Sequence, residues 1–193
     1  METANIFSEN VIIIDATYIN HVAFDLTVNF ERMLERRINQ ADIPTLLDCM
    51  ALDGGLQPGQ NQIQVIFVYK KLSPCDYLNP SNIASLDGKA FQSNLGEFTI
   101  QALPLEENLI DANNFMTDIF SLAIESKKTH KIVLAPDTDK GAQSFAHIAK
   151  DAKKQITILA MSPLHGSGFT TEILGYSLMQ AMNIKSEELI AHS

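Results

Sequence analysis

The sequence has few basic residues, few cysteines and no long apolar run. Its 193 residues include 14 Lys and Arg against 23 Asp and Glu, which gives a formal net charge of −9. Such a chain repels nucleic acid at long range, because affinity for nucleic acid comes mostly from neutralised phosphates. The charge argues against tight nonspecific binding of DNA or RNA. It does not argue against a site where metal ions carry the positive charge.

Signals for disulfides, export and membranes are also missing. Cys49 and Cys75 are the only cysteines, and they lack the CxxC spacing of a zinc site. The first ten residues carry two Glu and no Lys or Arg, which is unlike a signal peptide. No apolar run approaches the roughly 18 residues of a membrane span. We therefore expect reduced thiols, a cytoplasmic location and no membrane partner.

The sequence does contain a series of short apolar runs with amphipathic segments between them. Five runs predict strands, at residues 11–15, 62–69, 97–102, 130–135 and 155–161. Helices are predicted at residues 22–38, 43–52, 142–152 and 170–182, and a further helix is expected to open at Pro104. Alternating strands and helices predict an α/β fold with a mainly parallel sheet covered on both faces.

The whole chain, residues 1–193, suits a single domain. Residues 70–96 are rich in turn formers and read as an irregular excursion from the core, and residues 168–193 read as a C-terminal helical segment. The last helix has more apolar residues than one buried face needs, so it is either a core helix or a subunit contact in a homo-oligomer. In the helix at 22–38, the pattern assigns Phe24, Val28, Leu34 and Ile38 to the apolar side.

Carboxylates stand at three strand-to-helix edges of this predicted sheet. Asp15 ends the first strand, and Asp137 and Asp139 follow the fourth in KIVLAPDTDKG. Asp111 is expected one turn into the helix opened by Pro104, with Glu107 four residues earlier on the same face. Because ligands bind at the carboxyl edge of open α/β sheets, these acids are expected to converge. The alternative is structural: they cap helices and shape turns.

A divalent cation would remove the repulsion among such acids, which otherwise raises their pKa values. Mg²⁺ or Mn²⁺ is the expected cofactor, since both prefer carboxylate and water oxygens. Such an ion can activate water and stabilise charge on a phosphodiester.

Three stretches carry a family resemblance. VIIID at residues 11–15, ENLIDANNFMTDIF at 107–120 and KIVLAPDTDKGAQSFAHIAKDAKKQITILA at 131–160 together resemble the NYN branch of the PIN-like nucleases. The resemblance implies a three-layer, Rossmann-like sandwich with strand order 3-2-1-4-5. It also implies a Mg²⁺- or Mn²⁺-dependent ribonuclease acting on RNA, with Asp15, Asp111, Asp137 and Asp139 at the catalytic and metal-binding positions.

The chain also departs from that family pattern. The family often has Asn three residues after the first Asp, whereas Tyr18 stands there and the nearest Asn is Asn20. Lys140 and Gly141 replace the Phe that follows the acidic pair. Lys140 either meets a phosphate or neutralises Asp137. These departures favour a second hypothesis, a non-catalytic interaction or regulatory module.

Other catalytic patterns are weaker. The five histidines are scattered, and His147 reads as a surface or packed residue rather than a base. Asp15-Ala16-Thr17 is similar to phosphatases with an aspartyl nucleophile, but those need a second Asp where Thr17 stands. The sequence has neither GxxxxGK[ST] nor GxGxxG, so nucleotide cradles of those kinds are not expected.

Overall fold

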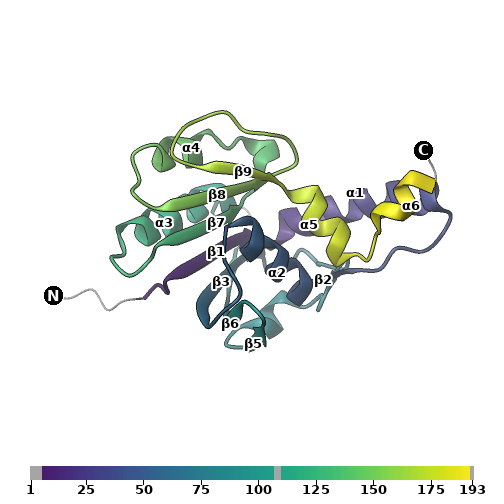
Figure 1. The fold of residues 1–193 in the computed structure, drawn as a ribbon, viewed down its shortest axis with the longest axis horizontal. Coiled ribbons are helices and arrows are strands. Elements are labelled where there is room, and N and C mark those ends of the chain that lie inside the picture. Colours follow the sequence, from purple (N-terminus) through teal and green to yellow (C-terminus); the bar gives the residue numbers. More distant parts are fainter. Residues whose placement is uncertain (1–5, 107–109, 192–193) are drawn as a thin grey trace.

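The structure, a computed structural model, describes residues 6–106 and 110–191. Its main sheet has helices on both faces (Figure 1). The strands of this sheet are β1 (Asn10–Asp15), β3 (Asn61–Lys70), β5 (Ala90–Ser93), β6 (Gly96–Leu105), β7 (Lys131–Ala135), β8 (Gln155–Ala160) and β9 (Thr170–Ile173). The helices are α1 (Ala16–Leu34), α2 (Ile43–Asp53), α3 (Ala112–Glu125), α4 (Gln143–Ala149), α5 (Leu174–Ala181) and α6 (Ser186–Ala191).

The sheet has the order β5-β6-β3-β1-β7-β8-β9, and every pairing is parallel except β5 with β6. The five strands expected from the sequence are β1, β3, β6, β7 and β8, and they stand in the expected order 3-2-1-4-5. The expected number of strands was wrong, because the main sheet has seven. The two unexpected strands, β5 and β9, lie at the edges and alternate between exposed and half-buried residues, so they lack the apolar run of a central strand.

Strand β1 lies in the middle of the core. All six of its residues are buried. Ile12 and Ile14 belong to the apolar cluster under α1, α2 and α5, whereas Val11 and Ile13 belong to the cluster under α3 and α4. A strand covered on both faces needs apolar residues at every position, which is why the run shows no alternation.

Helix α1 begins earlier than the sequence predicts and buries a different face. It starts at Ala16, directly after β1, rather than near residue 22. Ile19, Val22 and Ala23 are buried against the sheet, while Phe24 and Val28 are 40% and 47% exposed. The predicted apolar side was therefore wrong at these two positions. The buried stripe of α1 runs through Ile19, Ala23 and Thr27, and Phe24 and Val28 each come one residue later, so helical spacing turns them away from the sheet.

Two other boundaries differ. β6 continues through Pro104 to Leu105, so the third crossover helix opens at Ala112. β5 pairs with β6 only as far as Thr99, and beyond that point β6 is an edge where a proline is tolerated. Residues 170–173 form β9 instead of the first turn of the last helix. There the β-branched Thr170 and Thr171 extend the sheet.

The excursion at residues 70–96 contains short elements. β4 (Leu78–Asn79) pairs with β2 (Ala41–Asp42), and the 3₁₀ helix η1 (Ile83–Leu86) follows. Leu78, Ile83 and Leu86 are buried in the same cluster as α1 and α2, so the excursion covers one side of the core. Among the described residues, no helix combines the length and apolarity needed to cross a membrane.

Candidate functional site

A pocket of about 340 Å³ opens where β1, β3 and β7 end. It is lined by Asp15, Thr17, Tyr18, His21, Lys70, Ala112, Asp137, Asp139 and Lys140. From β1 the chain proceeds to β3 and β6 on one side, and later returns to β7 on the other. The carboxyl ends of β1 and β7 therefore flank the point where strand order reverses, which is where open α/β sheets bind ligands.

Asp15 is buried at the inner end of this pocket, with 4% of its surface exposed. Its Oδ1 accepts a hydrogen bond from the backbone N–H of Tyr18 at 2.9 Å, so it also caps α1. Burial raises the pKa of Asp15 to about 6, and the Asp137 charge adds to the rise, while the Tyr18 bond and the charges of Lys140 and Lys70 oppose it. A buried carboxylate beside a second one gains from a cation placed between them.

Asp137 reaches the pocket from the other strand. Its Oδ1 accepts from the backbone N–H groups of Asp139 and Lys140, at 3.1 and 3.3 Å, and so caps the 3₁₀ helix η2 (Thr138–Lys140). Its Oδ2 lies 3.8 Å from Lys140 Nζ. The Lys140 side chain is 55% exposed, whereas that of Asp137 is 14% exposed. The pair therefore has the acid inside and the cation at the opening.

Hydroxyl groups and a second lysine complete the walls. The Tyr18 hydroxyl lies 3.2 Å from Thr138 Oγ1, and burial raises the pKa of this phenol. Thr17 Oγ1 accepts from the backbone N–H of Lys70 at 2.9 Å, which joins the start of α1 to the end of β3. The side chain of Lys70 faces the pocket and lies near enough to Asp15 to influence its pKa.

Two of the other predicted residues, Asp111 and Asn20, do not line this pocket. Asp111 is exposed and caps α3, accepting from the backbone N–H groups of Asn113 and Asn114; its neighbour Ala112 lines the pocket in its place. Because α3 opens at Ala112, Asp111 does not lie one turn inside a helix as the sequence suggested. Asn20 Oδ1 accepts from the Tyr77 backbone at 2.8 Å and so fixes a loop. Glu107 lies outside the described residues.

Comparison with known proteins gives a family but no activity. Residues 4–189 match a family described as "Family of unknown function (DUF6621)". The chain belongs to the DUF6621 family. No curated protein matches it, and no solved structure matches it.

In this DUF6621 protein, four polar residues of the pocket were not among the predicted site residues: Thr17, Tyr18, His21 and Lys70. The first three were assigned to a loop or left out because α1 was expected to start later. With the helix begun at Ala16, their spacing places Thr17 and His21 on one face. Lys70 could have been found from the sequence, since it directly follows the strand predicted at 62–69 and so lies at the same sheet edge as Asp15.

The pocket residues could hold a divalent cation only together with water and a substrate phosphate. Within residues 6–106 and 110–191, no group of three or more His, Cys, Asp or Glu could hold a metal ion unaided. Mg²⁺, however, usually keeps several waters and takes one or two carboxylates together with substrate phosphates. Asp15 and Asp137 meet that smaller requirement, and two lysines of the pocket could share the phosphate charge.

Proposed function

We propose that this protein is a Mg²⁺- or Mn²⁺-dependent ribonuclease that hydrolyses RNA phosphodiesters at this pocket. One observation carries the proposal: Asp15 and Asp137 follow adjacent parallel strands and line the same pocket at the reversal of strand order. The resemblance to PIN-like nucleases supports the same assignment. A cytoplasmic location belongs to the proposal, and both free cysteines are buried.

The pocket residues then have separate roles. Asp15 and Asp137 would hold the cation, and Asp139 would act through a bound water. The cation would stabilise charge on the phosphate and lower the pKa of a water molecule. Lys70 and Lys140, which line the pocket, would bind the phosphate oxygens. Asp111 acts indirectly, because it caps the start of α3 beside the pocket.

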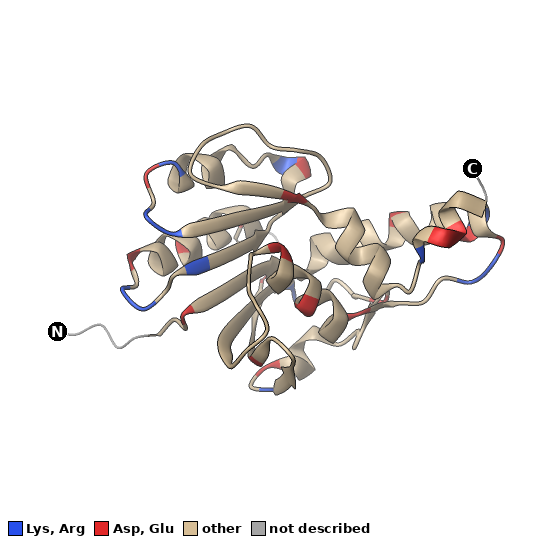
Figure 2. Cartoon of the chain, viewed as in Figure 1, with Lys and Arg blue, Asp and Glu red and all other residues tan. Residues whose placement is uncertain are grey.

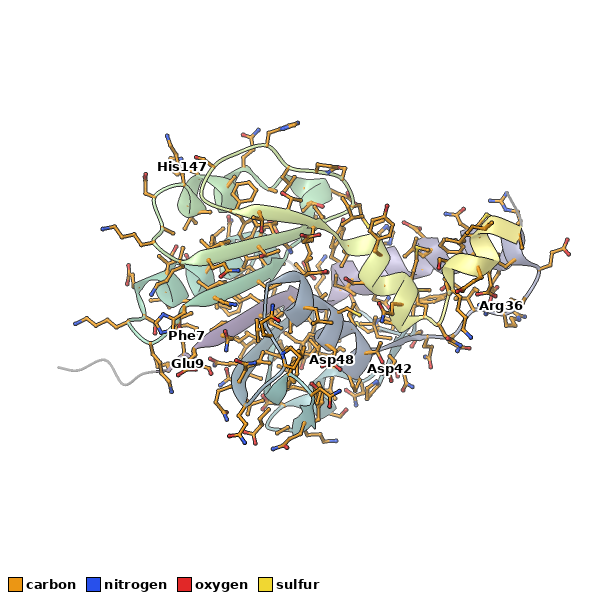
Figure 3. The ribbon with its side chains drawn as sticks, viewed as in Figure 1. Phe7, Glu9, Arg36, Asp42, Asp48 and His147 are labelled. Carbon is orange, nitrogen blue, oxygen red and sulfur yellow. The ribbon has the colours of Figure 1, made fainter. Side chains whose placement is uncertain are left out.

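The test is incubation of purified protein with a labelled single-stranded oligoribonucleotide, in Mn²⁺ or in EDTA. We expect cleavage that needs Mn²⁺ and is lost in Asp137→Asn. His147→Ala is the matched control, since Figure 3 places His147 on α4, away from the carboxyl end of β1. Equal cleavage by wild type and Asp137→Asn would mark the activity as contamination and would discard the nuclease assignment.

A second candidate, a non-catalytic interaction module, is favoured by one set of contacts. Asp15, Asp111 and Asp137 each cap the start of a helix or 3₁₀ helix, which is a sufficient structural reason for their presence. In that case we expect neither cleavage nor Mn²⁺ binding. A homo-oligomer through α5, whose Tyr176 is 72% exposed, would appear as a concentration-dependent mass in light scattering.

A further inference from the structure

A partly exposed aromatic pair lies one helical turn beyond the pocket. Thr17 and His21 line the pocket, and Phe24 and Val28 continue the same face of α1 at helical spacing. Tyr18 and Phe24 are six residues apart, or about 9 Å along the helix axis. Phe24 is 40% exposed although its neighbours Val22 and Ala23 are buried. The ring therefore lies on the outer side of α1 rather than in the core.

Tyr77, whose ring contacts Phe24, belongs to the segment that follows Lys70. The rings of Phe24 and Tyr77 meet edge to face, with centroids 5.1 Å apart and planes at 61°. Asn20 accepts from the Tyr77 backbone N–H at 2.8 Å and donates to the Pro74 carbonyl at 3.3 Å. These bonds tie the segment that follows Lys70 to α1. The aromatic pair is thus fixed relative to the pocket.

The two neighbouring features differ in chemistry, and a nucleotide has both. At the pocket, Lys70 and Lys140 offer positive charge to an anion in a protein of net charge −9. At the pair, an edge-to-face contact leaves aromatic surface open to a further planar ring. A phosphate bound beside the lysines carries a sugar and a base, and bases stack on aromatic side chains of this kind.

We infer that Phe24 and Tyr77 form a base-stacking subsite for a nucleotide whose phosphate occupies the pocket. The inference rests on the proposed function, because it uses the same pocket as the phosphate site. A base can reach a side-chain platform only when it is unstacked from its neighbours, so the ligand is single-stranded rather than duplex RNA. Asn20 is then a positioning residue that keeps Tyr77 against Phe24.

Two small ligands that cannot be cleaved as phosphodiesters separate the base from the phosphate. Adenosine 5′-monophosphate and ribose 5-phosphate, each titrated calorimetrically in Mg²⁺, share the sugar phosphate, and only the first carries a base, in place of the anomeric hydroxyl. With wild type we expect the base to strengthen binding about 5- to 150-fold. With Phe24→Ala the two ligands should bind equally, whereas Phe24→Trp should keep the preference. Lys70→Met should weaken both ligands by the same factor.

Two control variants separate loss of the Phe24 ring from loss of folding, and this site from an aromatic residue elsewhere on the surface. Phe24→Leu keeps an apolar contact with Tyr77 but removes the ring, so it should lose the base preference even if Phe24→Ala proves unstable. Tyr176→Ala removes a more exposed aromatic residue from α5 and should bind both ligands as wild type does.

Several outcomes would overturn the inference. Equal affinity of wild type for both ligands, or a base preference that survives in Phe24→Leu, would remove the stacking subsite. If the stacking subsite is removed in this way but RNA cleavage still depends on Mn²⁺, the proposed ribonuclease function stands. If neither ligand binds and no RNA is cleaved, the stacking subsite and the ribonuclease function are both wrong. A dimer that Phe24→Ala dissociates, with unchanged ligand binding, would assign this face to a second copy of the chain.

Discussion

The two ends of the parallel strands use lysine in different ways. At the amino ends, Lys131 Nζ donates to the Gly55 carbonyl at 2.8 Å, and Lys154 Nζ donates to the carbonyls of Ser126 and Thr129 at 2.7 and 2.6 Å. Figure 2 shows basic segments gathered on the loops at this end, on the left of the view. Lys131 and Lys154 are thus fixed by the backbone.

At the carboxyl ends the cations face carboxylates instead. Lys140 Nζ lies 3.8 Å from Asp137, and Lys70 lines the pocket near Asp15. An exposed ion pair is weak and can exchange its partner for a ligand, whereas a lysine bound to two carbonyls cannot leave without cost. Loss of charge should therefore affect stability at one end of the sheet and binding at the other.

The largest expected effect concerns Mn²⁺ binding at the carboxyl end. Asp137→Asn removes one of the two carboxylates assigned to the ion, so binding should weaken at least about 1000-fold, or about 4 kcal/mol. The measurement is titration calorimetry of the two folded proteins with Mn²⁺. Lys131→Met, at the amino end, should give the heats of wild type. Equal heats for wild type and Asp137→Asn would discard the metal assignment.

The next effect is a pH dependence that belongs to Asp15. Its pKa is raised from 3.8 to about 6 in the folded protein, mainly by burial, so the folded state holds a proton that the unfolded state has lost. The contribution of Asp15 to the free energy of unfolding is fully present below about pH 4. It is lost as the pH rises through about 6, a change of about 3 kcal/mol. In EDTA, Asp15→Asn should keep the helix cap and show a flatter profile. Parallel denaturation profiles for the two proteins would contradict this.

A direct comparison of the two ends uses one lysine from each. Lys154→Met loses two charge-assisted hydrogen bonds and should lower the free energy of unfolding by about 2 kcal/mol. Lys140→Met loses an exposed contact and should change it by less than about 0.5 kcal/mol. Urea denaturation at pH 7 measures both. A larger loss in Lys140→Met than in Lys154→Met would reverse the distinction between structural and exchangeable lysines.

The sequence predicted the centre of the fold better than its margins. Residues 11–14 in β1 and 132–135 in β7 are unbroken apolar runs because both faces of these strands are covered, and such runs are visible in the sequence. The edge strand β9 is half exposed and has no such pattern. The start of α1 was missed for another reason: Thr17 and Tyr18 resemble loop residues, yet the helix begins at Ala16, directly after its cap Asp15.

The candidate site was predicted where its residues lie at the ends of central strands, and missed where they depend on the boundaries or the facing of helices. Asp15 ends one predicted strand and Asp137 comes two residues after another, so sheet topology alone brings them to one edge. Asp111 depends on where α3 begins, and that boundary is set by how far β6 extends past Pro104. The exposure of Phe24 depends on which face of α1 packs against the sheet, and helical spacing alone allowed the wrong choice.

The smallest effect on stability is expected where a side chain links the pocket to α3. Asn113 Nδ2 donates to the carbonyls of Asp137 and Gly141, at 3.0 and 3.4 Å, and so holds the loop that carries Lys140. Its Oδ1 is buried and has no hydrogen-bond partner within the described chain, so Asn113→Ala removes a desolvation penalty together with two hydrogen bonds.

These opposing contributions should leave the free energy of unfolding of Asn113→Ala within about 0.5 kcal/mol of wild type. Mn²⁺ affinity should nevertheless fall about 10-fold, because residues that orient a ligand affect binding through geometry. Thr129→Val is the matched change at the amino end, since Thr129 Oγ1 donates to the Ser8 carbonyl at 2.8 Å. It should lower stability by about 1 kcal/mol and leave Mn²⁺ binding unchanged. Denaturation and titration calorimetry on both variants measure these effects. Wild-type Mn²⁺ affinity in Asn113→Ala would contradict the contrast.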